Sequence, residues 1–207
     1  DEFQRAAGVD LRQDLLAALG GEVAFAVDGP VVPVPAWKLV LETYDSERLQ
    51  RAIEALVKSA NQELESRGQT LRMSISSQTI GGRRIYALAT ADGSFGISYT
   101  FVDGYWVIAS QQPVLQRAID DRASGLALVH SGQFEALWPK NSRRDVSAFV
   151  YSNLGPLMQS MQSAGSAAGL GADAKKTLGA LASQSGPSLQ WATGQPQSIT
   201  MGGTGPS

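Results

Sequence analysis

Three two-residue turn signals follow one another at short intervals in the middle of the chain, and they limit its fold more than any other feature. Gly81–Gly82, Asp92–Gly93 and Asp103–Gly104 separate runs in which apolar and polar residues alternate. Such pairs adopt the backbone angles of tight hairpins, and links this short join only antiparallel neighbours. The sequence therefore predicts an antiparallel meander built from segments 71–80, 83–90, 95–102 and 105–110.

Two helices are predicted beside these strands, and each contains the pentapeptide LQRAI. Asp45 caps the first helix and Gly68 ends it, while Gly125 ends the second. The apolar residues of both helices have the spacing of a single buried stripe, which includes Ile53 in the first and Ile119 in the second. We therefore expect both helices to pack on the sheet through these stripes.

The tripeptide V-D-G also occurs twice, at residues 27–29 and 102–104, one strand before each LQRAI helix. Two matches in the same structural order indicate a duplicated strand–turn–strand–helix unit over residues 22–57 and 97–123. The hypothesis places Ile53 and Ile119 at equivalent core positions. It also leads to the predicted fold class, a single α+β domain over residues 1–207 with a large, mainly antiparallel sheet and helices on one face.

The outer parts of the chain are predicted from the same periodicities. A helix over 11–19 should end at Gly20–Gly21, and strand 22–29 should be half-buried with Val23, Phe25 and Val27 on one face. The remaining predictions are a strand at 36–44, a helix from Ser131, a strand at 145–151, a helix opening at 154, a flexible Gly/Ala/Ser-rich segment at 162–172, a further helix after it, and a closing hairpin of 188–194 with 197–203.

Composition excludes several chemistries. The formal net charge is −2 and only 17% of residues are charged, so the chain lacks the basic surface of a nucleic-acid-binding protein. It has no cysteine, which rules out disulfides, thiolate metal sites and a cysteine nucleophile. The only histidine is His130, so zinc or copper sites and a Ser-His-Asp triad are not expected, and His130 is interpreted as structural or exposed. No catalytic, metal-binding or cofactor-binding residue is predicted, and no cofactor.

Three further patterns resemble functional motifs and have a simpler interpretation. Asp28 and Asp103 occupy matching places in the proposed repeat and could form the carboxylate pair of a glycoside hydrolase, but Asp before Gly is ordinary turn chemistry. The string GLGADA at 169–174 resembles a dinucleotide-binding fingerprint, yet no strand precedes it. The tryptophans could form a binding platform, but their positions favour the core; they are Trp37, Trp106, Trp138 and Trp191.

Three longer runs resemble a large bacterial family catalogued only as a domain of unknown function. They are GVDLRQDLLAALGGEVAFAV, SYTFVDGYWVIASQQPVLQRAID and SGQFEALWPKNSRRDVSAFVYSNLGPLM. The resemblance implies an exported, periplasmic or cell-envelope protein, with either an N-terminal signal or a single membrane anchor in a segment outside this chain. It implies no active-site residue, because the shared motifs are patterns of fold.

The expected function is a non-enzymatic cell-envelope module that binds another protein or an apolar ligand along its sheet or helix grooves, or serves as a scaffold. Two alternatives stay open. A carboxylate-dependent hydrolase would need two carboxyl groups about 5–9.5 Å apart in one cleft. A structural subunit of a larger envelope assembly would show an extensive exposed apolar patch.

Overall fold

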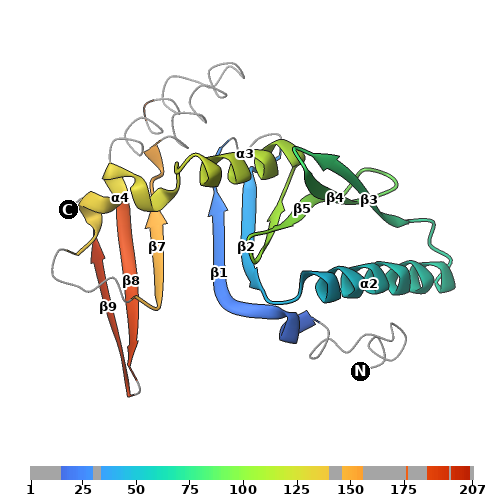
Figure 1. The fold of residues 1–207 in the computed structure, drawn as a ribbon, viewed down its shortest axis with the longest axis horizontal. Helices are drawn as coiled ribbons and strands as arrows, with labels where there is room; N and C mark the ends of the chain where they lie inside the picture. Colours follow the sequence, from blue (N-terminus) through green and yellow to red (C-terminus); the bar gives the residue numbers. More distant parts are fainter. Residues whose placement is uncertain are drawn as a thin grey trace. The chain divides into compact units, whose positions relative to one another are not determined.

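The computed structural model of the chain describes residues 15–29, 34–139, 146–155, 176, 186–195 and 197–205. The fold is α+β, as predicted, with a six-stranded and a three-stranded antiparallel sheet (Figure 1). The residues group into two compact units that divide between Asp120 and Asp121. The single domain over residues 1–207 stays a prediction, because compactness alone does not establish whether the two units fold together.

The sheet of the first unit has the strand order β1-β2-β6-β5-β4-β3, and all neighbours are antiparallel. The four strands from β3 to β6 form the meander that the turn signals predicted. Both residues of the Asp103–Gly104 turn have positive φ angles, of 49° and 79°, as a two-residue hairpin requires. The strands are β1 (Leu19–Val27), β2 (Trp37–Thr43), β3 (Met73–Ile80), β4 (Arg83–Thr90), β5 (Gly96–Val102) and β6 (Tyr105–Ala109).

Helix α2 (Ser46–Ser66) begins and ends where the sequence indicated. The Asp45 carboxylate accepts a hydrogen bond from the Arg48 backbone N–H at 2.9 Å, and Gly68 has a φ angle of 69°. The helix buries Leu49 and Ile53 against one face of the sheet, where they pack with a cluster of aromatic and aliphatic side chains. That cluster includes Tyr99, Ile108, Tyr86, Leu88, Phe101 and Trp106.

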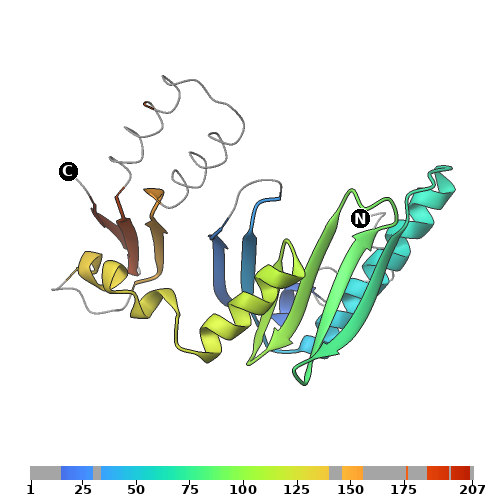
Figure 2. The same cartoon turned by 90° about the horizontal axis from the view of Figure 1, so that it is seen from above.

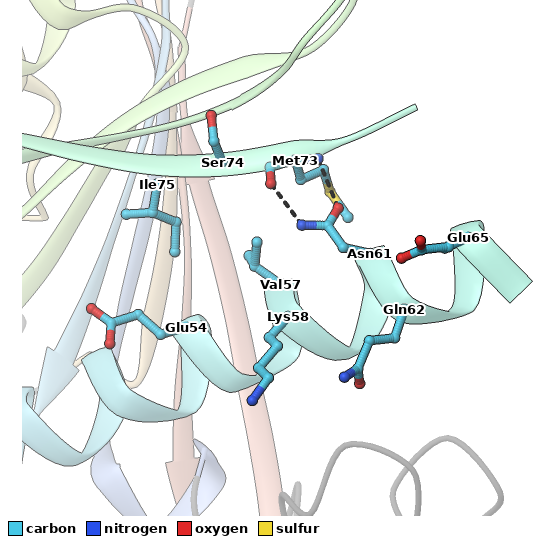
Figure 3. A pocket seen from close by; sticks show the side chains of 9 residues that line it. All are labelled: Glu54, Val57, Lys58, Asn61, Gln62, Glu65, Met73, Ser74 and Ile75. Atoms are coloured by element: carbon cyan, nitrogen blue, oxygen red, sulfur yellow. Dashed lines mark hydrogen bonds between the residues drawn. The ribbon is translucent and has the colours of Figure 1, made fainter. Parts of the chain in front are cut away.

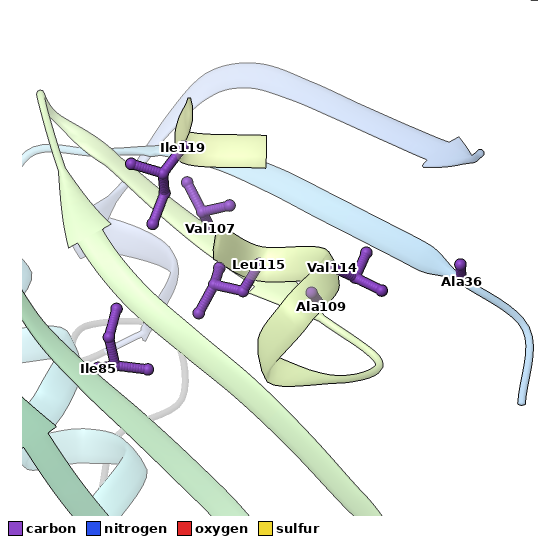
Figure 4. Packing of buried hydrophobic residues seen from close by; sticks show 7 residues of the cluster. All are labelled: Ala36, Ile85, Val107, Ala109, Val114, Leu115 and Ile119. Carbon is purple, nitrogen blue, oxygen red and sulfur yellow. The ribbon is translucent and has the colours of Figure 1, made fainter. Parts of the chain in front are cut away.

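Helix α3 (Gln112–Ala123) packs on the sheet through Leu115 and Ile119 (Figure 4). Its partners on β6 are Val107 and Ala109, whereas Ile108 between them packs under α2. Since successive side chains of a strand point to opposite faces, α2 and α3 cover opposite faces of the sheet (Figure 2). The predicted placement of the helices on one face is therefore wrong for this sheet.

The duplicated unit over 22–57 and 97–123 is not confirmed. Both members of the expected pair are buried, with 8% of Ile53 and 4% of Ile119 exposed, but they belong to different core clusters. β2 and β6 are antiparallel neighbours, so a two-fold axis that exchanged them would run perpendicular to the sheet and keep both helices on one face. The opposite placement of α2 and α3 is not compatible with that symmetry.

The glycine pair Gly20–Gly21 does not end a helix. In the described residues, which begin at Leu15, a short 3-10 turn (Leu16–Ala18) leads directly into β1, which starts at Leu19 and includes both glycines. The register of β1 against β2 is irregular here, and the Glu42 carboxylate accepts hydrogen bonds from the backbone N–H groups of Gly21 and Glu22. A Cβ atom on Gly20 would collide with the Glu42 side chain. The glycine therefore leaves room for the Glu42 side chain where the pairing of β1 with β2 is irregular.

The second unit contains the three-stranded sheet in the order β7-β8-β9, which confirms the closing hairpin. Helix α4 (Gly132–Leu137) follows Ser131, and it buries Phe134 within an aromatic cluster with Trp138, Phe149 and Tyr151. The Thr204 hydroxyl donates to the backbone carbonyl of Leu137. The strands are β7 (Ala148–Ser152), β8 (Ser188–Gln195) and β9 (Ser198–Thr204).

Trp191 on β8 lies over Gly202, its cross-strand partner on β9. A Cβ atom at Gly202 would lie 2.5 Å from the ring carbon Cζ2, so we expect Gly202→Ala to lower the free energy of unfolding by about 1–3 kcal/mol. Gly203→Ala is the matched control, because its Cβ would meet only ordinary contacts, 3.5 Å or more away. Urea denaturation of both variants measures the difference, and equal stabilities would contradict this packing.

Several predicted segments lie outside the described residues. They are most of the helix over 11–19, nearly all of the helix opening at 154, the flexible segment 162–172, all but residue 176 of the helix after it, and the GLGADA string at 169–174. Among the helices that the structure describes, none combines the length and apolar character needed to cross a membrane.

Candidate functional site

The two aspartates of the V-D-G turns lie at opposite ends of β2. The Asp28 backbone N–H donates to the carbonyl of Ala36, before β2 begins, while the Thr43 N–H at its far end donates to the carbonyl of Gly104. Seven residues of extended chain separate these points by roughly 20 Å. Asp28 forms a salt bridge with Lys38. This pair of carboxylates therefore cannot flank one glycosidic bond, which requires about 5–9.5 Å.

The other residues considered from the sequence do not converge on one site. His130 is exposed and ends a 3-10 turn (Leu128–His130). All four tryptophans are half-buried: Trp37 and Trp106 border the core under α2, and Trp138 and Trp191 lie in the second unit. In the described part of the chain, no three His, Cys, Asp or Glu side chains are grouped as a metal site would require.

A shallow groove of about 370 Å³ lies between α2 and the edge strand β3 (Figure 3). Its floor is fixed by Asn61, whose amide donates to the carbonyl of Met73 and whose side-chain oxygen accepts from the Met73 N–H, both at 2.8 Å. Arg72 adds a hydrogen bond to the Asn61 carbonyl and a salt bridge to Glu65. These polar groups are engaged in holding the helix to the strand.

The two acids of this groove are too far apart for glycosidase chemistry. Glu54 and Glu65 are eleven residues apart on one helix, a rise of roughly 16 Å. Glu54 accepts a hydrogen bond from the Gln50 amide at 2.7 Å, and Glu65 is paired with Arg72. The groove is therefore best explained as part of the helix–sheet packing.

The edge strand β1 presents the most unusual surface of the first unit. Val23, Phe25 and Val27 are 67%, 65% and 50% exposed, although they alternate along the strand like core residues. Their cross-strand partners on β2 are Leu41, Leu39 and Trp37, which belong to the α2 side of the sheet. The Phe25 ring stacks on Trp37 with ring centroids 6.4 Å apart. The expected half-buried strand is thus exposed on its apolar side.

The same three residues of β1 direct their backbone polar groups away from the sheet. The Thr43 N–H donates to the carbonyl of Gly104, and the Ser110 N–H donates to the carbonyl of Trp37. These two odd-numbered residues of β2 therefore form their backbone hydrogen bonds on the β6 side. Because bonding direction alternates along an antiparallel strand, the even-numbered residues of β2 bond to β1, as the bond from Asp28 to Ala36 also shows. The N–H and C=O groups of Val23, Phe25 and Val27 therefore point outward, where no described strand pairs with them.

The opposite edge of this sheet, β3, has a different character. Its exposed residues are polar, and among them the Gln78 amide donates to the Gln112 side chain. Polar residues on an edge strand discourage pairing with other chains, whereas a long apolar edge invites it. β1 is therefore the edge suited to accept a further strand, and the apolar row of Val23, Phe25 and Val27 is here named the β1 edge.

One protein-family model matches most of the chain. Residues 1–189 match the model of a family described as "Protein of unknown function (DUF3352)". The chain belongs to this family. No curated protein and no solved structure matches the chain. The DUF3352 match includes the whole first unit and hence the β1 edge, and the family's description names no reaction.

Sequence reasoning identified the residues of the β1 edge in this DUF3352 chain but misassigned their role. The alternation of Val23, Phe25 and Val27 predicts a half-buried strand, but a sequence pattern shows only which side chains share a face and not whether another element covers it. One signal was available: the strand lies outside the turn-linked meander, so it can join the sheet only beyond one end of the meander, as β1 and β2 both do.

Proposed function

We propose that this DUF3352 chain is a non-catalytic cell-envelope module that binds an extended segment of protein along the β1 edge. One observation carries the proposal: Val23, Phe25 and Val27 combine exposed apolar side chains with outward-pointing backbone donors and acceptors. A strand added there would gain main-chain hydrogen bonds and apolar contacts together, which is how peptides are recognised by strand addition.

The compartment in this proposal rests on composition and on family resemblance. The chain contains no cysteine, which suits an oxidising space outside the cytoplasm. An exposed edge with an apolar row also supports a protein partner over an apolar small molecule, since a small apolar ligand needs an enclosed cavity. The groove beside β3 is shallow and open to solvent, so it does not provide one.

A defined peptide tests strand addition. The probe is acetyl-Thr-Val-Thr-Phe-Thr-Val-Thr-amide, titrated into dilute isotope-labelled protein while backbone amide shifts are recorded by NMR. We expect saturable shifts at Val23, Phe25 and Val27, and at least a roughly tenfold weaker affinity for Phe25→Lys, because the lysine charge would be held against the partner's apolar row.

Two controls distinguish strand addition from nonspecific hydrophobic binding. Ser77→Lys introduces the same charge on the polar edge strand β3 and should leave peptide affinity unchanged. A peptide N-methylated at alternate residues keeps its side chains but loses main-chain donors, so it should bind much more weakly. Absence of shifts at β1, or equal affinity of the wild type and Phe25→Lys, would refute the proposed site.

A further inference from the structure

We infer that the strand accepted at the β1 edge comes from a second copy of the same chain. This inference rests on the proposed function and specifies its partner. Residues 23–27 read VAFAV, the same in both directions. If two copies pair antiparallel about a two-fold axis at Phe25, Val23 lies opposite Val27 of the second copy, and Phe25 lies opposite its own counterpart. Such self-complementarity is what an isologous dimer interface requires.

The backbone of β1 is compatible with this register. The outward N–H and C=O groups belong to Val23, Phe25 and Val27, which become the hydrogen-bonded pairs of the new ladder. The three pairs would exchange up to about six hydrogen bonds. The two apolar rows would meet on one face of the joined sheet, and on the other face Ala24 would lie opposite Ala26 of the second copy, where the small side chains leave room for close approach.

Neighbouring registers are less favourable. A shift of the axis to Ala24 places Val27 opposite Gly21 of the second copy, and a shift to Ala26 places Val23 opposite Gly29. Each shift leaves one valine of each copy without an apolar partner. The axis at Phe25 is the register in which all three exposed side chains face another apolar side chain.

The charges at the ends of the pair limit its strength. Glu22 would lie opposite Asp28 of the second copy, which brings two acids together. Asp28 is already neutralised by its salt bridge to Lys38, and Glu22 accepts a hydrogen bond from the Tyr105 hydroxyl at 2.7 Å. The residual repulsion is at an exposed rim, so added salt should strengthen association.

The size of the contact indicates a weak dimer. A pair of short strands buries much less than the roughly 1,200–2,000 Å² of a stable interface. We therefore expect a dissociation constant of roughly 10 µM to 1 mM. At such concentrations the average mass measured by sedimentation should rise from 21.9 kDa toward twice that value.

Cysteine cross-linking tests the register, since the native chain contains no cysteine. Ala24→Cys and Ala26→Cys are prepared separately, mixed and mildly oxidised. In the inferred pair, positions 24 and 26 of different copies are about 4.5 Å apart at Cα, within disulfide range. Position 24 is roughly 8 Å from its own counterpart, which is too far. The mixture should therefore give roughly fivefold more disulfide dimer than either variant alone.

Sedimentation of the unmodified chain completes the test. Wild type and Ser77→Lys should associate equally up to about 1 mM, and Phe25→Lys should stay monomeric. A monomeric wild type, or equal cross-linking by each cysteine variant alone, would overturn the inference. Strand-peptide binding is measured on dilute protein, so a monomer that still binds the peptide refutes only the self-pairing. A chain that does neither refutes the proposed function as well.

Discussion

Replacing Leu49 by alanine should lower the free energy of unfolding by about 2–5 kcal/mol, the range for removing a fully buried leucine side chain. Leu49 lies on the buried side of α2 and is completely buried, packed among Ala18, Ile53, Tyr99 and Ile108. The sheet below is held by its hydrogen bonds and covered on its other face by α3, so the cavity left by the substitution cannot close easily. Urea denaturation of the purified variant measures the loss.

Leu16→Ala is the control for Leu49→Ala. Leu16 lies in the same compact unit but is 63% exposed, so its truncation should change the unfolding free energy by less than about 0.5 kcal/mol. If Leu49→Ala lost as little as Leu16→Ala, the α2 face of the sheet would not be a core.

The second large effect is a loss of stability in alkaline solution that depends on Tyr99. This residue is fully buried, and burial raises the pKa of Tyr99 to about 12 despite the hydrogen bond from its hydroxyl to Gln50. In the unfolded chain a tyrosine titrates near pH 10. Below pH 10 the Tyr99 phenol is protonated in both the folded and the unfolded chain, so the unfolding free energy does not change with pH through this group.

Between pH 10 and 12 the unfolded chain loses the Tyr99 proton while the folded chain retains it. The unfolding free energy should therefore fall by up to about 1.4 kcal/mol per pH unit, in total on the order of 2 kcal/mol by pH 12. Denaturation curves recorded across this interval measure the slope for the wild type and for Tyr99→Phe.

Two tyrosine variants isolate this contribution from other groups that titrate in the same interval. Tyr99→Phe should be less stable at pH 7, because Gln50 loses its buried partner, but its stability should depend less on pH above 10. Tyr44→Phe removes a tyrosine that is 71% exposed and should keep the wild-type slope. Identical slopes in wild type and Tyr99→Phe would show that Tyr99 ionises equally in both states.

The local elements followed from the sequence because their causes are local. The positive φ angles at Gly81, Gly82 and Gly104 depend on the absence of a side chain, and the cap at Asp45 depends on a carboxylate three residues before an N–H group. Short turns then required antiparallel neighbours, so the meander from β3 to β6 was determined before any tertiary contact was known.

The faces and edges of the sheet depended on tertiary structure. The two LQRAI helices have similar apolar stripes, yet α2 packs on the face of Ile108 and α3 on the face of Val107. A stripe fixes which side of a helix is buried, and the path of the connecting chain decides which face of the sheet receives it. The role of Gly20 also depended on a distant residue, Glu42, whose carboxylate occupies the space that a side chain would need.

The β1 edge also combines a property determined by the sequence with one decided by the tertiary structure. The sequence determined that Val23, Phe25 and Val27 share one face of a strand, because side chains alternate along an extended backbone. Only the tertiary structure decided that this strand ends the sheet and that its apolar side is exposed. The physical reason is that burial depends on what lies beside and above a strand, and those neighbours come from distant parts of the chain.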